Sequence, residues 1–221
     1  MTSWEIVPGE TPIDDISGLK RKDVRTRSEL AIVEAENVRK VIVKYLAAKP
    51  SRRLASFELS WALKLHSEMF GDVWDWAGQS RTIDLNLGVH WPQVQLALQD
   101  LLADLRVWEK AWPDVLDQAA HLHHRAVRIH PFLNGNGRWA RMLANIWLQR
   151  QGAKITVWPE ESIGTVSAIR DEYLQAIKSA DNGKIDELIE LHRRFSDENI
   201  PKASESTFET LRKSNDRPHR P

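Results

Sequence analysis

Residues 130–141 read His-Pro-Phe-Leu-Asn-Gly-Asn-Gly-Arg-Trp-Ala-Arg and lie between two segments with helical periodicity. Pro131 disfavours helical geometry at the preceding residue, so we expect the upstream helix to end at or near His130. The glycines on either side of Asn136 can adopt positive φ and bring backbone N–H groups close to a bound group. Because the N-terminus of the following helix carries partial positive charge, the turn suits a phosphate.

Two arginines, Arg138 and Arg141, fall in the first turns of that following helix. Residues three apart lie on one face of a helix, and cations near its N-terminus oppose the dipole unless an anion compensates them. A polyphosphate would compensate them. With the imidazole of His130 as a base, the set predicts phosphoryl or nucleotidyl transfer. The structural alternative is a glycine-rich turn with surface arginines.

Apolar residues at helical spacing continue on both sides of this segment. They predict helices over about 28–48, 56–70, 94–108, 114–129, 136–151, 161–180 and 184–195. Between Gly78 and Gly88 polar and apolar residues alternate, which predicts a short strand or hairpin with Ile83, Leu85 and Leu87 on one side. The predicted fold class is all-α with one small β element.

The chain divides into four expected regions. They are an irregular arm over 1–27, an N-terminal helix within 28–55, a core domain over 56–200 and a polar tail over 201–221. The arm carries prolines and glycines without a sustained period, and the tail has few apolar residues. A single large domain with extensions fits the 221 residues.

Composition excludes several classes of function. Lys plus Arg and Asp plus Glu both number 31, so the formal net charge is zero and direct nucleic-acid or anionic-membrane binding is not expected. The absence of cysteine excludes disulfides, thiol nucleophiles and Cys-ligated zinc. No apolar run approaches the ~20 residues of a membrane-spanning helix, and the start lacks a signal peptide. We therefore expect a cytoplasmic protein.

Residues 130–141 resemble the signature of the Fic (Fic/Doc) family, His-Pro-Phe-x-(Asp/Glu)-Gly-Asn-Gly-Arg-x-x-Arg, at every defined position but one. Similarity extends to residues 76–78 and 81–84, which resemble the family's flap, and to 173–177 and 188–189, which resemble its closing helices. The details are most similar to the subgroup called mobile mystery protein B.

This resemblance implies a Fic-fold helical bundle with a β-hairpin flap, and transfer of AMP from ATP to a Ser, Thr or Tyr hydroxyl of a target protein with release of pyrophosphate. By match to the motif, His130 would be the general base and Phe132 a buried anchor. The implied phosphate-binding residues are Gly135, Asn136, Gly137, Arg138 and Arg141. The implied target-docking flap contains Arg81, Thr82, Ile83 and Asp84, which would pair with an extended stretch of the target.

The departure from the signature is Asn134, where the family usually has the acidic residue that holds Mg²⁺. A neutral amide oxygen is a poorer ligand for this hard cation, although Mg²⁺ in phosphate sites often takes most of its ligands from substrate and water. A slower enzyme, a changed use of the nucleotide and an inactive binder are the open outcomes. We expect activity to survive with weakened metal affinity.

Fic proteins are commonly restrained by a helix bearing (Ser/Thr)-x-x-x-Glu-(Gly/Asn), whose glutamate pairs with the second motif arginine. Glu36-Asn37 is the partial match, with Ile32 where Ser or Thr is expected. We therefore hypothesise that Glu36 restrains Arg141; the alternative is that Glu34 and Glu36 are solvated helix charges. Some family members also have a small antitoxin-like partner.

Three histidines before the motif offer a different reading, a metal-dependent hydrolase. His121 and His124 are three apart on a helix and could share a metal, but no carboxylate lies at helical spacing between them. Of the three histidines, His121, His123 and His124, one or two are expected to pack or hydrogen-bond beneath the active-site loop and the others to face water. A non-enzymatic alternative is a nucleotide-sensing protein weakened at Asn134.

Overall fold

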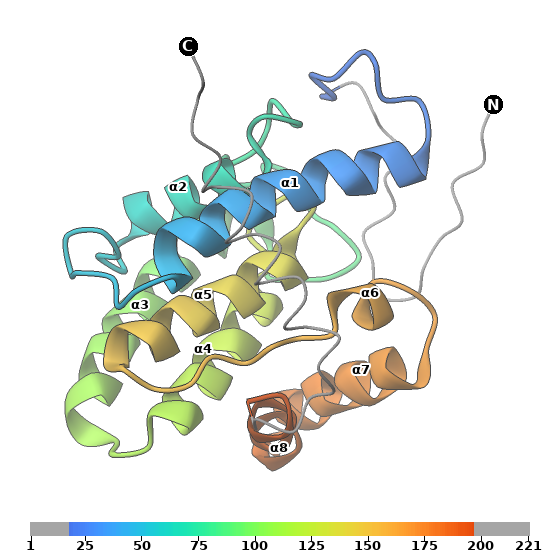
Figure 1. Ribbon diagram of the computed structural model, residues 1–221. Coiled ribbons are helices and arrows are strands. Elements are labelled where there is room, and N and C mark those ends of the chain that lie inside the picture. Colours follow the sequence, from blue (N-terminus) through green and yellow to red (C-terminus); the bar gives the residue numbers. More distant parts are fainter. Residues whose placement is uncertain (1–17, 197–221) are drawn as a thin grey trace, which may run out of the picture.

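The computed structural model describes residues 18–196 of the chain (Figure 1). Most of the arm expected over 1–27, and all of the tail expected over 201–221, lie outside these residues. The described elements are α1 (Arg27–Leu46), α2 (Leu59–Phe70), the single 3-10 turn η1 (Trp91–Gln93), α3 (Val94–Ala111), α4 (Val115–Ile129), α5 (Asn136–Gln151), α6 (Glu160–Ile163), α7 (Ala168–Asp181) and α8 (Asp186–Arg194). None of these helices is long and apolar enough to cross a membrane. The predicted helical fold class is confirmed.

Side chains at the helix ends explain several boundaries. Thr26 and Glu29 form a reciprocal capping box at the start of α1. Asp114 accepts hydrogen bonds from the N–H groups of Leu116 and Asp117 at the start of α4. Gly152 ends α5 in the left-handed conformation, with φ of 78°.

Helix α5 lies at the centre of the bundle, between α1 and α4 and against α2 (Figure 1). Its Trp139, Leu143, Ile146 and Trp147 are buried, and together they face several neighbouring helices. A helix that is buried on most sides is a core helix. Because neighbours hold α5 on several sides, its N-terminus, which carries the motif arginines, has a fixed position.

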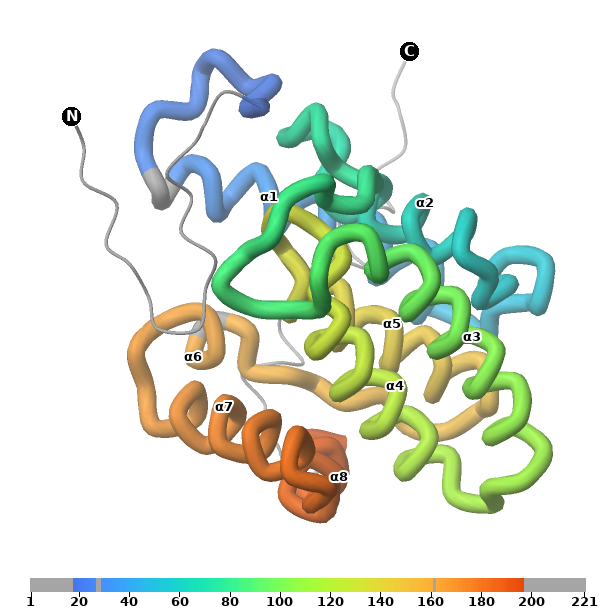
Figure 2. The backbone as a smooth tube through the Cα atoms, turned by 180° about the vertical axis from the view of Figure 1, so that it is seen from behind, coloured from blue at the N-terminus to red at the C-terminus, as the bar shows by residue number. Residues whose placement is uncertain are grey.

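The C-terminal helices form a second, smaller cluster against α4 (Figures 1 and 2). The helix expected over 161–180 is interrupted: α6 ends before Gly164, and α7 begins after Ser167, whose hydroxyl accepts from the N–H of Arg170 at 3.1 Å. This new N-cap competes with a continuous helix. The interruption leaves Glu160 at the start of α6, facing α5.

The expected β-hairpin flap is not seen: residues 79–90 form an irregular loop, which we call the flap loop. The alternation of apolar residues does not bury one side, since Ile83 is 54% and Leu87 43% exposed. The carbonyls of Ile83 and Val89 accept from the Arg81 guanidinium instead of from an opposite strand. An isolated two-stranded hairpin is marginal, so this internal side-chain partner determines the conformation. Figure 2 shows the flap loop, in green, beside the junction of α4 and α5.

Candidate active site

His130 follows the last residue of α4, as the sequence predicts, and adopts the left-handed conformation with φ of 52°. Its side chain lies in a buried environment, with 7% of the residue exposed. Nδ1 lies 3.3 Å from the carbonyl oxygen of Val127. An N–H at this atom donates to that carbonyl and places the ring's lone pair on Nε2.

Desolvation lowers the pKa of His130 to about 4; the Val127 carbonyl opposes this shift and the charge of Arg81 adds to it. The imidazole is therefore neutral at pH 7. A neutral imidazole with its lone pair on Nε2 is the form that accepts a proton from a hydroxyl.

The turn after His130 is held from within by Asn136. Its Oδ1 accepts from the N–H of Phe132 and its Nδ2 donates to the carbonyl of Phe132, both at 2.9 Å. Asn136 is 2% exposed and Phe132 is fully buried. Asn136 was expected to contact phosphate, but its side chain is committed to the turn, and only its backbone N–H can contribute to an anion site.

The two motif glycines differ, because Gly135 adopts a positive φ before α5, whereas Gly137 lies in the first turn of α5. Gly135 has φ of 76°, and a Cβ there would lie 2.7 Å from the ring of Phe70. A Cβ on Gly137 would lie 3.4 Å from Nη1 of Arg141, so this guanidinium lies against the turn. The first amides of α5 lack acceptors within the helix. Free amides at a helix N-terminus favour an anion, and the Arg141 guanidinium lies beside them.

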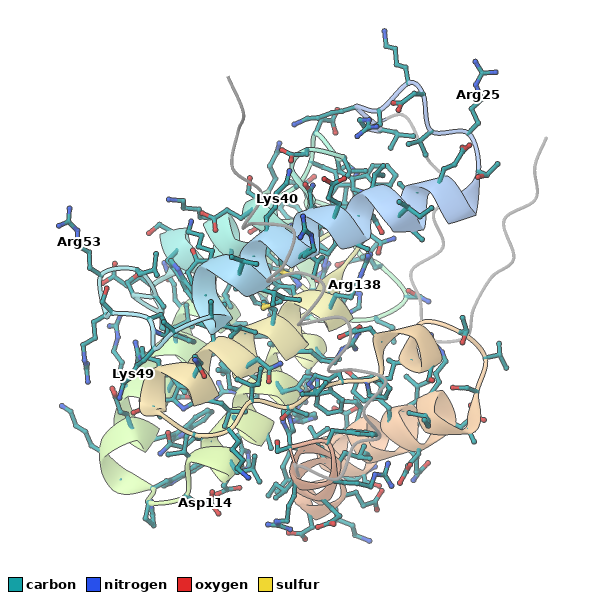
Figure 3. The ribbon with its side chains drawn as sticks, in the orientation of Figure 1. Arg25, Lys40, Lys49, Arg53, Asp114 and Arg138 are labelled. Carbon is teal, nitrogen blue, oxygen red and sulfur yellow. The ribbon has the colours of Figure 1, made fainter. Side chains whose placement is uncertain are left out.

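Arg138 is paired with Glu34 on α1. Its Nη1 lies 2.6 Å from Oε2 of Glu34, and its guanidinium lies over the ring of Phe70 at 4.6 Å. The other carboxylate oxygen of Glu34 accepts from Nε1 of Trp74 at 2.7 Å. Figure 3 shows Arg138 between α1 and the first turn of α5.

Arg141 points to a different helix. Its Nε donates to Oε1 of Glu160 at 2.8 Å, Nη2 donates to the other oxygen, and the ring of Tyr173 lies 5.4 Å from the guanidinium. Burial opposes the charge of Arg141, but Glu160 outweighs it, so the pKa of Arg141 is raised. Each motif arginine is thus neutralised by its own carboxylate.

The ion pair between Glu34 of α1 and Arg138 corrects the hypothesis that Glu36 restrains Arg141. Glu36 is exposed, and the carboxylate of α1 that reaches the motif is that of Glu34, which contacts the other arginine. A signal was present in the sequence: Glu34 lies four residues after Leu30 and seven before Val41, on the apolar stripe of α1. Glu36 lies off that stripe.

Asn134 does not offer a preformed Mg²⁺ site. Its Oδ1 accepts from the N–H of Gly135, and the oxygen is neutral. Within residues 18–196 no group of three or more His, Asp or Glu side chains is placed to hold a metal ion. The donor set does not fit a resident Mg²⁺, because Mg²⁺ prefers charged oxygen ligands. It is compatible with Mg²⁺ that arrives bound to the phosphates of a nucleotide, as part of the substrate.

His66 of α2 is a site residue that the sequence analysis missed. Nδ1 accepts from the N–H of Gly78 at 2.9 Å, Nε2 donates to the backbone carbonyl of Asn134 at 3.0 Å, and the ring stacks on Phe132 with centroids 3.6 Å apart. Desolvation lowers its pKa to about 3, so it is neutral. The available signal was a lone polar residue on the apolar stripe that contains Leu65 and Met69.

The four flap residues divide into two kinds. Thr82 and Ile83 are exposed and accessible to a partner. Asp84 supports the loop itself, since its carboxylate accepts from the N–H of Trp91 at 2.8 Å. Arg81, expected to face a target, has a fully buried side chain.

The histidines before the motif do not converge on a metal. Nε2 of His124 lies 2.9 Å from Asp181, and His121 lies 3.6 Å from Asp117. His123 is buried, and its Nε2 lies 3.0 Å from the hydroxyl oxygen of Tyr173. Because His121 and His124 face different carboxylates, the geometry does not favour the hydrolase reading.

Residues 56–148 match the model of the Fic/DOC family. This segment is therefore similar in sequence to the Fic/DOC family. Protein adenylyltransferase fic-1 of Caenorhabditis briggsae is 28% identical over 143 residues, which are 62% of this chain and 27% of the relative. Protein adenylyltransferase Fic of Drosophila grimshawi is 29% identical over 148 residues, 65% of this chain and 29% of the relative. The chain thus spans less than a third of the length of these relatives.

Solved structures of Fic domains share the fold. A fragment of Fic-1 from C. elegans superposes with a TM-score of 0.62 and 23% identity, covering 90% of this chain and 56% of the fragment. BepC of Bartonella tribocorum, solved with bound AMPPNP, superposes with a TM-score of 0.59 and 18% identity, covering 81% of this chain and 92% of BepC. The described residues therefore share the helical fold of these two structures.

Proposed function

We propose that this Fic domain is a protein adenylyltransferase that transfers AMP from ATP to a Ser, Thr or Tyr hydroxyl of a target protein. The observation that carries the proposal is a neutral, buried His130 directly before a glycine turn and a helix N-terminus with two arginines. The relatives named protein adenylyltransferases support it.

The reaction follows from these groups. Nε2 of His130 takes the proton of the target hydroxyl, and the hydroxyl oxygen forms a bond to the α-phosphorus of ATP. The bond from that phosphorus to the β-phosphate oxygen breaks, and pyrophosphate leaves. The amides of Gly137 and Arg138 and the guanidinium groups neutralise the phosphate charge, which is the main work in phosphoryl transfer. The proton remains on His130 until solvent removes it.

The same geometry supports regulation by α1. The phosphates of ATP need Arg138 and Arg141, yet Glu34 and Glu160 occupy them. We propose that Glu34, rather than Glu36, restrains the site, and that ATP must displace it from Arg138.

Docking of the target is assigned to the exposed part of the flap loop. Thr82 and Ile83 can pair with an extended segment of a target, since main-chain pairing tolerates many side chains. A small antitoxin-like partner, membership of the mobile mystery protein B subgroup and a cytoplasmic location are further parts of the proposal. They are supported by the motif and flap sequences and by the composition.

The test is incubation with α-labelled ATP, Mg²⁺ and lysate, with γ-labelled ATP in parallel. Label from the α-position on protein, absent in His130→Ala and retained in His121→Ala, supports the proposal. Label released as free AMP would indicate hydrolysis, ATP retained without turnover would indicate a sensor, and γ-label on protein would indicate the reversed nucleotide orientation of Doc. Each of these three outcomes contradicts the proposal.

A further inference from the structure

We propose that Arg81 is a positioning residue that holds the flap loop and the His130 turn in one shared geometry. The inference rests on the proposed function, because it assigns Arg81 its effect through the base and the docking loop. It differs from the expectation that Arg81 docks the target, since the side chain is fully buried.

One guanidinium connects both segments. Nε of Arg81 donates to the carbonyl of His130 at 2.7 Å, and Nη1 donates to the carbonyl of Ile83 at 2.8 Å. Nη2 donates to the carbonyl of Val89 and lies 3.5 Å from that of Ile129. The acceptors therefore include two carbonyls of the flap loop and two at the junction of α4 with the motif. Moving either segment breaks bonds to the other.

The chemistry of the acceptors explains why an arginine lies here. The last carbonyls of α4 lack partners within the helix, and the negative end of the helix dipole favours a cation beside them. His130 holds a left-handed backbone, which is unfavourable for a non-glycine residue, so it needs outside support. Only a guanidinium presents five donors in a rigid fork; an ammonium cannot reach carbonyls on opposite sides.

Backbone contacts seat the flap loop on the same turn. The N–H of Arg81 donates to the carbonyl of Pro131 at 2.9 Å. Gly88 has φ of 101°, and a Cβ there would lie 2.6 Å from Cβ of His130 and 2.7 Å from Nη2 of Arg81. The loop is thus packed against the base itself, so a target bound to the loop is registered against His130.

The test compares full-length wild type with Arg81→Met, Arg81→Lys and, as a matched control, Arg106→Met, which removes an exposed arginine of α3. We expect Arg81→Met to lower kcat by about 10²-fold, the loss typical of a misplaced reacting group. KM for ATP should change less than about threefold, because Asn136 and His66 hold the phosphate turn separately. Arg81→Lys should recover part of kcat, and Arg106→Met should match wild type.

Two readouts do not need activity. In protein with ¹⁵N-labelled histidine, Arg81→Met should shift the NMR signals of the His130 imidazole, and amide hydrogen exchange over residues 82–90 should accelerate at least about tenfold. If wild type transfers no AMP, the proposed function fails while these readouts still decide the role of Arg81. Unchanged His130 signals and unchanged exchange in Arg81→Met would overturn the inference, whatever happens to kcat.

A second variant covers the case in which Arg81→Met does not fold. Gly88→Ala drives a methyl group between the loop and His130 and should give the same NMR shift and faster exchange. Its control is Gly183→Ala, which also has positive φ, at 81°, but whose added Cβ would meet nothing within 4 Å. Equal behaviour of the two alanine variants at His130 would contradict the proposal.

Discussion

The turn between α4 and α5 and the flap loop lie side by side but are held in different ways. The turn is closed by a partner four residues away, since Asn136 binds both backbone groups of Phe132. The flap loop is held by Arg81, whose acceptor at His130 is 49 residues distant. The turn, which carries the proposed reactive groups, therefore depends on a contact between near neighbours in the sequence. The flap loop depends on a long-range contact with that turn. Changes in the turn should therefore affect chemistry and stability directly.

The largest effect is expected at His130. His130→Ala removes the base and should lower kcat for AMP transfer by about 10²- to 10⁴-fold. ATP affinity should change little, because the proposed phosphate-binding groups lie at the start of α5. Rates with α-labelled ATP and calorimetric binding of ATP measure the two separately. His121→Ala is the control. Near wild-type transfer by His130→Ala would show that His130 is not the base of the reaction.

Stability tests the claim that the turn is locally closed. Asn136→Ala leaves the N–H and carbonyl of the buried Phe132 without partners, and each such group costs about 1–3 kcal/mol. We expect a loss of at least about 2 kcal/mol in urea unfolding. Asn86→Ala, on the exposed part of the flap loop, should change the free energy of unfolding by less than about 0.5 kcal/mol. Equal losses would show that the two segments are held in the same way.

His66 bonds to the turn at Asn134 and to Gly78, the residue just before the flap loop, and makes this support pH-dependent. Its pKa is about 3 in the folded protein, below the ordinary histidine value of 6.5, so the unfolded chain binds one more proton between these pH values. The stability from neutral His66 is present above pH 6.5 and is lost as pH falls, by up to about 1.4 kcal/mol per pH unit. His66→Gln should reduce the slope of unfolding free energy against pH between 4 and 6. His90→Gln, at an exposed site, is the control; identical slopes in both variants would exclude this role of His66.

Glu34 tests whether the turn is restrained from outside. Glu34→Gln keeps the shape of the side chain but removes the charge beside Arg138, so ATP no longer competes with a carboxylate. We expect transfer and ATP affinity to rise about three- to tenfold, a range typical of coupling between sites. Glu36→Gln on the exposed face of α1 should leave both unchanged. A rise with Glu36→Gln alone would restore the original hypothesis.

Sequence and structure agree where the determinants are local. The end of α4 before Pro131 and the stop of α5 at Gly152 depend on neighbouring residues, and both were predictable. The path of the flap loop was not predictable, because the alternation around Ile83 predicts strands but does not indicate which segment pairs with them. The partner of Arg138 was also missed, because the motif sequence does not indicate which residues of α1 pack beside α5. The helical period could have identified Glu34, but only after α1 is known to face the site.

The smallest expected effect concerns Asn134, whose neutral oxygen is engaged by the N–H of Gly135. Asn134→Asp adds a charged oxygen ligand for Mg²⁺ beside the phosphate turn. The Mg²⁺ concentration for half-maximal transfer should fall about two- to fivefold, with little change in kcat at saturating Mg²⁺. Asn86→Asp adds the same charge on the flap loop and controls for long-range attraction. If the Mg²⁺ dependence of Asn134→Asp equals that of wild type, the ion is held by the nucleotide phosphates alone and residue 134 serves only to shape the turn.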